Sequence, residues 1–319
     1  MSVLIIIIVI LSVLILVYRI DRLEITSIDS DLDVDISNLD SFLHQSESIH
    51  TSLRHGTQKR IQWFDQPQKT EYSVLYVHGL SASANEISPI PESIAKSLQA
   101  NLYFPRLTGH GSDGHSLAAA HAENWLADLE QSWNIAASIG EKVIILASST
   151  GATLVECFLN RLAKNSALVS LVYLSPNFGV QHPLSAISSW PFSQYWLPAL
   201  LGQLHEGHYE NELQQQIWTY NYPVAVFRQM QRLMDAMYRL RVVPVSIPLL
   251  VFLCEKDEVV SSKKTRKFLS RSHVNTSYHL IEPKEGSSNH VITGTAIRPE
   301  TNQRVIETIL AHLNKSLSQ

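Results

Sequence analysis

The chain has 319 residues, of which 45% are hydrophobic and 17% charged, so it can build a large core and is not disordered as a whole. Its formal net charge of −4 and the absence of a Lys/Arg cluster argue against a nucleic-acid partner. The two cysteines, Cys157 and Cys254, both lie in apolar segments, so we expect buried free thiols rather than a disulfide or a reactive thiol.

The first twenty residues are strongly apolar. Residues 3–17 read VLIIIIVILSVLILV, and Tyr18-Arg19 ends the run. It is slightly shorter than the ~20 residues of a comfortable bilayer span, yet longer than most signal-peptide cores, and no small-x-small cleavage pattern follows it. We interpret residues 1–20 as an uncleaved transmembrane helix, with a cleaved signal peptide as the alternative. Arg19 and Arg22 weakly favour a cytoplasmic main domain by the positive-inside rule, which leaves the sidedness open.

Residues 21–55 are predicted to be an acidic spacer with one short helix. In SIDSDLDVDISNLD, residues 27–40, aspartates alternate with small or apolar residues. No register of this stretch has the glycine and the glutamate of a calcium-binding loop, so a solvated spacer is favoured. The pattern of residues 37–49 predicts a short amphipathic helix, and KRIQWF at 59–64 predicts an early strand.

The remaining residues, 56–319, show apolar strand patterns that alternate with amphipathic helical patterns. Strands are predicted over 73–79, 101–107, 142–148, 168–176, 247–254 and 276–282, and helices over 91–100, 123–140, 152–165 and 299–317. Strands that are apolar on both faces and alternate with helices predict an α/β domain with a mainly parallel sheet covered on both sides.

One long segment, about 181–246, interrupts this alternation. It contains no clear strand pattern and many large apolar side chains, among them Trp190, Trp196, Trp218 and Phe227. A structureless stretch of this length is unusual in a compact domain, so we predict a helical insertion. It would serve as the core of a small subdomain, as an apolar cap above a site, or as both.

The segment VIILASSTGATLVECF, residues 143–158, passes from a buried strand to a helix through small residues. A nucleophile elbow has the form small-x-Ser-x-Gly, because neighbouring backbone crowds the turn. Ala147 and Gly151 give Ser149 this surrounding, whereas Ser148 has Thr150 at the position where glycine is required. Ser149 is therefore the candidate nucleophile; the alternative is that Ser149 or Thr150 only caps the helix.

A serine nucleophile needs a base, and the base needs an acid to orient it. Asp257 follows the strand at 247–254, and His290 lies in a loop after the last strand, which gives the chain order Ser, Asp, His. Glu255 and Glu258 are substitutes for Asp257, and we expect them to flank it in solvent.

Two backbone amides are candidates to bind an oxyanion. His78-Gly79 ends the first strong strand, so the amide of Leu80 could point into the site together with the amide of Thr150. We expect His78 and His110 to be structural residues in the loops that flank the site. The sequence HEGH at 205–208 spaces its histidines three apart rather than four, without a third ligand, so no metal site is expected.

The segments YVHGLSAS, FPRLTGHGSDG, ILASSTGATL, FLCEKDEVV and SSNHVI resemble the α/β-hydrolase superfamily, in particular capped bacterial serine esterases and monoacylglycerol-lipase-like enzymes. The resemblance covers the chain from about Gly56 to its end. It implies a sheet of about eight strands, Ser149, Asp257 and His290 as catalytic triad, and Leu80 and Thr150 as amide donors. Ala147 and Thr108 depart from the usual family pattern, which bears on the subfamily rather than on the reaction.

Together these features predict a membrane-tethered serine hydrolase that cleaves carboxylic esters with an acyl chain, without metal or organic cofactor. Its partners would be an ester or lipid-like small molecule and the membrane; the oligomeric state is left open. The alternatives are a thioesterase or acyltransferase with the same triad, and a non-catalytic scaffold that kept the fold.

Overall fold

The apolar runs predicted as strands form one sheet in the computed structural model, which describes residues 2–25, 35–241 and 243–318. The strands are β1 (Arg60–Gln62), β2 (Thr70–Val77), β3 (Asn101–Phe104), β4 (Gly140–Ser148), β5 (Leu168–Leu174), β8 (Leu249–Leu253) and β9 (Thr276–Leu280). Their order is β1-β3-β2-β4-β5-β8-β9, and every pair is parallel except β1 with β3.

The sheet therefore has seven strands, and the expected number of about eight is wrong. The segment before β1 forms the helix α2 (Leu39–Ser48), as the pattern of residues 37–49 predicted. The carboxylate of Glu47 in α2 holds the guanidinium of Arg106, at 2.7 Å from Nε, and both side chains are buried. This ion pair ties α2 to the loop after β3.

Strand β4 shows why the central strands are apolar throughout. Val143, Ile145 and Ala147 pack into one core cluster, and Ile144 and Leu146 pack into the other on the opposite face. Side chains alternate between the faces of a strand, so a strand covered on both sides needs apolar residues at every position.

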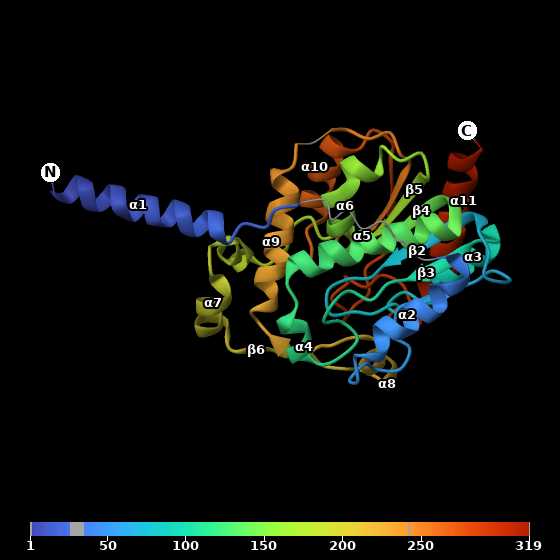
Figure 1. Ribbon diagram of the computed structural model, residues 1–319, viewed down its shortest axis with the longest axis horizontal. Helices are drawn as coiled ribbons and strands as arrows, with labels where there is room; N and C mark the ends of the chain where they lie inside the picture. The colour runs from blue at the N-terminus through green and yellow to red at the C-terminus, as the bar shows by residue number, and fades with distance from the viewer. Residues whose placement is uncertain (1, 26–34, 242, 319) are drawn as a thin grey trace.

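Helices cover both faces of the sheet, as predicted (Figure 1). The first core cluster takes in residues of α2, α5 (Ala122–Ile139), α6 (Thr150–Leu162), α9 (Val226–Arg239) and α10 (Ser262–Ser272). The second takes in α3 (Ile90–Leu98) and α11 (Asn302–Leu317). The helices α4 (Gly114–Ala119) and α10 were not predicted. In α10, SKKTRKFLSRS is mostly charged or polar, and Phe268 and Leu269 are its only large apolar residues, both buried.

The segment between β5 and β8 contains most of the remaining helices. These are α7 (Ser193–Leu201), α8 (Glu212–Ile217), α9 and a 3-10 helix at Pro183–Ser189. A short strand pair, β6 (Leu204–His205) with β7 (Tyr222–Pro223), also lies there, although no strand was expected. Two residues are too few to leave an alternating pattern in the sequence. The limits of the cap at 181–246 stay a prediction.

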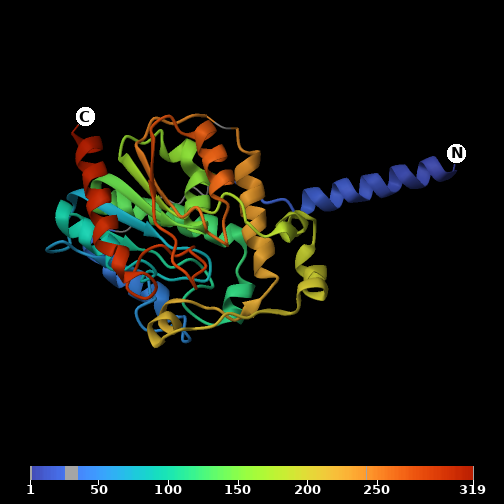
Figure 2. The ribbon, with the colours of Figure 1, turned by 180° about the vertical axis from the view of Figure 1, so that it is seen from behind.

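The N-terminal helix α1 (Ser2–Ile20) projects away from the rest of the chain, as Figures 1 and 2 show from opposite sides. Its base is fixed by Asp21, whose carboxylate bonds to Arg228 at 2.6 Å and to the amide of Phe192 at 2.9 Å. In the part of the chain that the structure describes, no helix combines the length and the hydrophobicity needed to cross a membrane. Residues 26–34 of the predicted acidic spacer lie outside the described residues.

Both cysteines are free and buried, as predicted. Burial raises the pKa of the Cys157 thiol, mainly because a thiolate would lose its hydration there. Such a thiol is unreactive.

Candidate active site

Ser149 forms the sharp turn between β4 and α6. Its backbone has φ 47° and ψ −115°, a conformation that residues other than glycine rarely adopt. A Cβ at Gly151 would overlap the carbonyl oxygen of Val77 and lie 2.8 Å from that of His78, so only glycine fits there. Ser149 makes no capping hydrogen bond to α6, so its interpretation as a helix cap is wrong.

His290 and Asp257 come from two loops and meet Ser149. The Nε2 of His290 lies 2.9 Å from Ser149 Oγ, and its Nδ1 lies 2.9 Å from Asp257 Oδ2. The other carboxylate oxygen of Asp257 accepts the amides of Val259 and Val260 at 2.8 and 2.9 Å. These amides hold the carboxylate in place. The carboxylate in turn holds the imidazole so that its Nε2 faces the hydroxyl of Ser149.

Asp257 rather than either neighbouring glutamate holds His290. Glu255 pairs with Arg266 on the surface, at 2.7 Å, and its side chain is 56% exposed. Glu258 is exposed too and lines the mouth of the cavity above Ser149. The chain order of the three candidate residues is thus matched by one continuous line of hydrogen bonds.

The surroundings of His290 favour its charged form. Burial acts against an imidazolium, but the charge of Asp257 and its hydrogen bond outweigh this, so the pKa of His290 is raised above 6.5. The buried carboxyl of Glu86 acts in the same direction. An imidazolium that forms beside Ser149 would accordingly be stabilised.

The two amides considered as oxyanion donors lie at the same cavity. Leu80 and Thr150 both line it together with Ser149 and His290. Thr150 is the first residue of α6, so its N–H precedes the helical hydrogen bonds and has no acceptor within the helix. Within the described residues, the N–H of Leu80 donates to no acceptor. Both amides are therefore available to a ligand.

One buried carboxyl beside the site was not predicted from the sequence. Glu86 Oε2 accepts the amide of Gly79 at 2.9 Å and the hydroxyl of Tyr76 at 2.7 Å. A Cβ at Gly79 would lie 3.1 Å from Glu86 and 3.2 Å from the Cβ of Ser149, so the carboxyl, the loop and the serine are in close contact. Burial raises the pKa of Glu86. Glu86 holds the loop that carries the Leu80 amide, and no motif in SASANEIS indicates this.

The two histidines beside the site act as structural residues, as expected. His78 Nε2 accepts the amide of Leu107 at 3.2 Å, and burial lowers the pKa of His78 to about 4, which keeps it neutral. The ring of His110 packs against Trp125 and His78, with ring centroids 5.6 and 5.0 Å away. These contacts join the loops after β2 and β3.

A cavity of about 650 Å³ opens above Ser149, between the sheet edge and the segment that follows β5. Its apolar wall comes mainly from this segment, with Leu197 and Leu201 of α7, Leu204 of β6, and Phe227 and Met230 of α9. The volume lies within the ~300–1,000 Å³ of small-molecule sites. The cavity can accept an apolar group several carbons long next to the serine.

The first histidine of the HEGH segment belongs to a cluster of aromatic rings. His205 lies in β6, and its ring packs against Tyr222 and Phe227, with centroids 4.8 and 5.4 Å away. Within the described residues, no group of three or more His, Cys, Asp or Glu side chains could hold a metal ion.

Comparisons with known proteins give the family and support the fold. The model of the family described as serine aminopeptidase, S33, matches residues 68–284. The chain belongs to this family. As a member it is a hydrolase of the α/β type, and the matched range begins just before β2 and includes Ser149 and Asp257, whereas His290 follows it.

Solved structures share the fold at low sequence identity. A structure from the work on LipS and LipT, two metagenome-derived lipolytic enzymes, has a TM-score of 0.65 and 18% identity, over 82% of this chain and 99% of that one. A soluble variant of monoglyceride lipase from Saccharomyces cerevisiae gives 0.58 and 13%, over 84% and 97%. Est1E from Butyrivibrio proteoclasticus with bound ferulic acid gives 0.56 and 13%, over 82% and 96%. No curated protein sequence matches the chain.

Proposed function

We propose that this S33-family hydrolase cleaves carboxylic esters that carry an acyl chain, through an acyl-enzyme on Ser149. The observation that carries the proposal is the line of hydrogen bonds from Asp257 through His290 to the Oγ of Ser149. A serine with this partner at 2.9 Å can lose its proton to the imidazole as it attacks.

In the proposed reaction His290 Nε2 takes the proton of Ser149 as Oγ bonds to the acyl carbon. The amides of Leu80 and Thr150 receive the oxyanion, and Asp257 stabilises the imidazolium. His290 returns the proton to the alcohol that leaves. Water then attacks the acyl-enzyme by the same route and releases the acid, so the reaction draws on no metal or organic cofactor.

The apolar wall of the cavity supports an acyl chain in the substrate. Leu197, Leu201 and Met230 would bury a chain next to Ser149, and each buried methylene contributes about 0.8 kcal/mol. We expect decanoate esters to be cleaved with a much higher kcat/KM than acetate esters. Comparable values for the two would contradict this part of the proposal.

The decisive experiment is covalent labelling with a fluorophosphonate probe. Wild-type protein should be labelled and should hydrolyse p-nitrophenyl decanoate, whereas Ser149→Ala should do neither. The matched control is Ser148→Ala, because Ser148 is adjacent but its hydroxyl lies by Tyr76, at 3.1 Å. Equal labelling of wild type and Ser149→Ala would exclude Ser149 as the nucleophile.

A second candidate function is the release of an N-terminal residue from peptides, since the family is described as serine aminopeptidases. Three carboxyl side chains, those of Glu86, Glu206 and Glu258, line the cavity and could pair with an α-amino group. Assays with aminoacyl p-nitroanilides beside the p-nitrophenyl esters separate the two. An added alcohol acceptor, followed by product analysis, separates hydrolysis from acyl transfer; a thioester substrate tests the thioesterase alternative.

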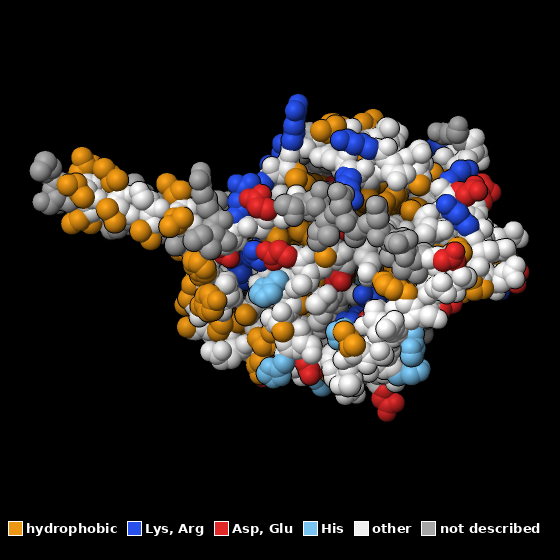
Figure 3. All heavy atoms as spheres, in the orientation of Figure 1, with side chains coloured by type: hydrophobic (Ala, Val, Ile, Leu, Met, Phe, Trp, Pro, Cys, Tyr) orange, Lys and Arg blue, Asp and Glu red, His pale blue; other side chains and the backbone are white. Residues whose placement is uncertain are grey.

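We further propose that α1 anchors the protein in a membrane as a single pass, with the hydrolase domain in the cytoplasm. The side chains of Leu4, Ile6 and Ile15 are 63%, 56% and 57% exposed. Figure 3 shows hydrophobic side chains along the projecting helix. So much apolar surface in water is unfavourable. The 19 residues of α1 are just below the ~20 that span a bilayer when the helix stands perpendicular to it. The support for the anchor is therefore the exposed apolar side chains rather than the length of the helix.

Membrane fractionation tests this anchor. We expect the full chain to remain in the membrane pellet after an alkaline carbonate wash, and a variant with Ile6→Lys and Ile15→Lys to be released. Protease added to sealed right-side-out vesicles should leave a cytoplasmic domain intact, whereas in inverted vesicles it should digest the domain. Release of the unmodified chain by carbonate would contradict the anchor.

A further inference from the structure

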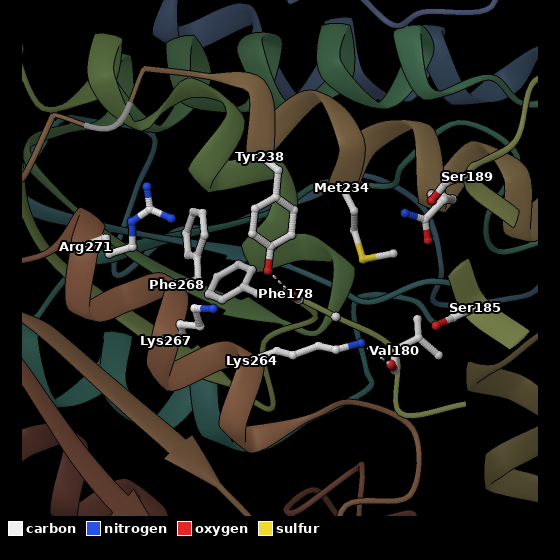
Figure 4. A pocket seen from close by; sticks show the side chains of 12 residues that line it. Phe178, Val180, Ser185, Ser189, Met234, Tyr238, Lys264, Lys267, Phe268 and Arg271 are labelled. Atoms are coloured by element: carbon white, nitrogen blue, oxygen red, sulfur yellow. Dashed lines mark hydrogen bonds between the residues drawn. The ribbon is translucent and has the colours of Figure 1, made fainter. Parts of the chain in front are cut away.

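A second cavity, of about 390 Å³, lies between α9, α10 and the loop that follows β5 (Figure 4). Val180 and Ser185 line both this cavity and the one above Ser149, so the two are neighbours. Its volume is within the ~300–1,000 Å³ of small-molecule sites. Neither the triad nor the two amides take part in it.

Aromatic rings form the apolar part of this second cavity. Phe178 and Phe268 lie with ring centroids 4.8 Å apart, and Tyr238 meets Phe268 edge to face at 5.4 Å. The hydroxyl of Tyr238 donates to the carbonyl of Phe178, which orients the ring, as the dashed line in Figure 4 shows. The thioether of Met234 completes this surface. Such a surface favours an alkyl chain or an aromatic ring.

Three cations of α10 line the same cavity. Lys264, Lys267 and Arg271 follow a spacing of three and four residues, which places them on one face of the helix. None of the described residues that line the cavity is acidic, and these three make no ion pair with any described residue. By contrast, Arg266 on the same helix pairs with Glu255 at 2.7 Å.

The one carboxylate of α9, that of Asp235, lies beside the cavity and is already bound. It accepts hydrogen bonds from two residues that line the cavity, Gln231 at 2.8 Å and Ser189 at 3.4 Å, and it lies 3.6 Å from the guanidinium of Arg228. Lys264 donates to the carbonyl of Val180 at 3.1 Å, which is a neutral acceptor. The lining therefore carries three cations, and the one carboxylate beside it is shared with a further cation, Arg228.

We propose that this cavity is a second ligand site, which takes a small organic anion with an apolar chain. The head group would bind to Lys267 and Arg271, and the chain would lie on Phe178, Tyr238 and Phe268. A carboxylate and a phosphate monoester both suit a lysine and an arginine fork, so the shared chemistry is an anionic head on an apolar tail. The inference does not require Ser149 to be catalytic.

The test is calorimetric titration of the full-length Ser149→Ala protein, which cannot turn over a ligand. The probes are decanoate and decyl phosphate, each below its critical micelle concentration, decan-1-ol below its solubility limit, and inorganic phosphate. We expect saturable binding of decanoate, decyl phosphate or both, and at least about tenfold weaker binding of the uncharged alcohol and of the chainless phosphate. Which of the two anions binds more tightly identifies the source of the head group.

Variants locate the binding. Lys267→Gln with Arg271→Gln should weaken binding of the anion about tenfold or more, whereas Lys267→Arg should retain it. The matched control is Lys263→Gln with Lys315→Gln, which removes two exposed charges that do not line the cavity. Equal affinity in the cavity variant and the control would overturn the proposal, as would decan-1-ol binding as tightly as decanoate or inorganic phosphate binding as tightly as decyl phosphate. The esterase activity of the wild type is measured in a separate assay. A failure of the proposed function at Ser149 can therefore be told apart from a failure of the second ligand site.

Discussion

The imidazole of His290 lies 2.9 Å from the hydroxyl oxygen of Ser149, although 141 positions separate the two residues in the chain. One residue ends the turn after β4 and the other lies in the loop after β9, at the carboxyl edge of the same parallel sheet. The fold brings them together because parallel strands all end at one edge.

The rate of ester cleavage should depend on the protonation of His290. Its imidazolium cannot accept the serine proton, so kcat/KM should rise with pH to a plateau. Because Asp257 raises the pKa of His290 despite burial, the midpoint should lie above 6.5. A pH profile of kcat/KM for p-nitrophenyl decanoate measures it. A midpoint well below 6.5 would show that His290 is not the titrating base.

Asp257→Asn should lower kcat by about 10³–10⁴-fold, with little change in stability. The amide can still accept from Val259 and Val260, but its NH₂ group would face His290 Nδ1 and favour the wrong tautomer. Glu255→Gln is the control, since Glu255 pairs with Arg266 at the surface. Steady-state kinetics of both variants test the assignment; it fails if the control loses as much activity as Asp257→Asn.

Glu86 should act as a positioning residue for the loop that carries the Leu80 amide. In Glu86→Ala the buried Gly79 amide and Tyr76 hydroxyl lose their acceptor, and we expect kcat to fall by about 10–100-fold while KM changes little. Glu86→Gln keeps one oxygen that can accept both groups, so it should restore most of kcat. If Glu86 had only a structural role, both variants would have a lower melting temperature, and kcat would not fall while KM stayed the same.

Gly151→Ala should destabilise the protein and strongly reduce activity. The added methyl group would overlap the carbonyl of Val77, and neither β2 nor α6 can move without disturbing the turn at Ser149. We expect a loss of about 1–3 kcal/mol or more in the free energy of unfolding, from thermal or denaturant melts. Gly202→Ala is the control, because no atom lies within 4 Å of its added Cβ; it costs only about 1–2 kcal/mol of backbone strain at φ +89° and should leave kcat unchanged. A normal kcat and melting temperature for Gly151→Ala would contradict the close approach at the elbow.

Several elements could be predicted because their signal is local. The seven strands that form the sheet and the helices α3, α5, α6 and α11 each carry their own apolar periodicity. The turn at Ser149 was predictable because Ala147 and Gly151 must be small for steric reasons. Asp257 and His290 were predictable because they follow strands in a fixed order.

Other features depend on contacts between distant segments. The pattern of residues 37–49 predicted the helix α2 but not its main contact, in which Glu47 is held by Arg106, 59 positions away. The helix α10 was not predicted because three of its five buried residues are serine or threonine, so its buried face shows little apolar periodicity. The strands β6 and β7 are too short to show a period.

The sequence alone determined which residue types stand at which strand ends, since local backbone geometry admits few residues at an elbow and periodicity follows burial. Only the tertiary structure decided that Glu86 lies against Gly79. It also decided that two lysines and one arginine of α10 line the same cavity as the rings of Phe178 and Tyr238. These groups are positioned by loop paths and helix packing, whose contacts join residues far apart in the chain. Such contacts leave no period or motif in the residues themselves.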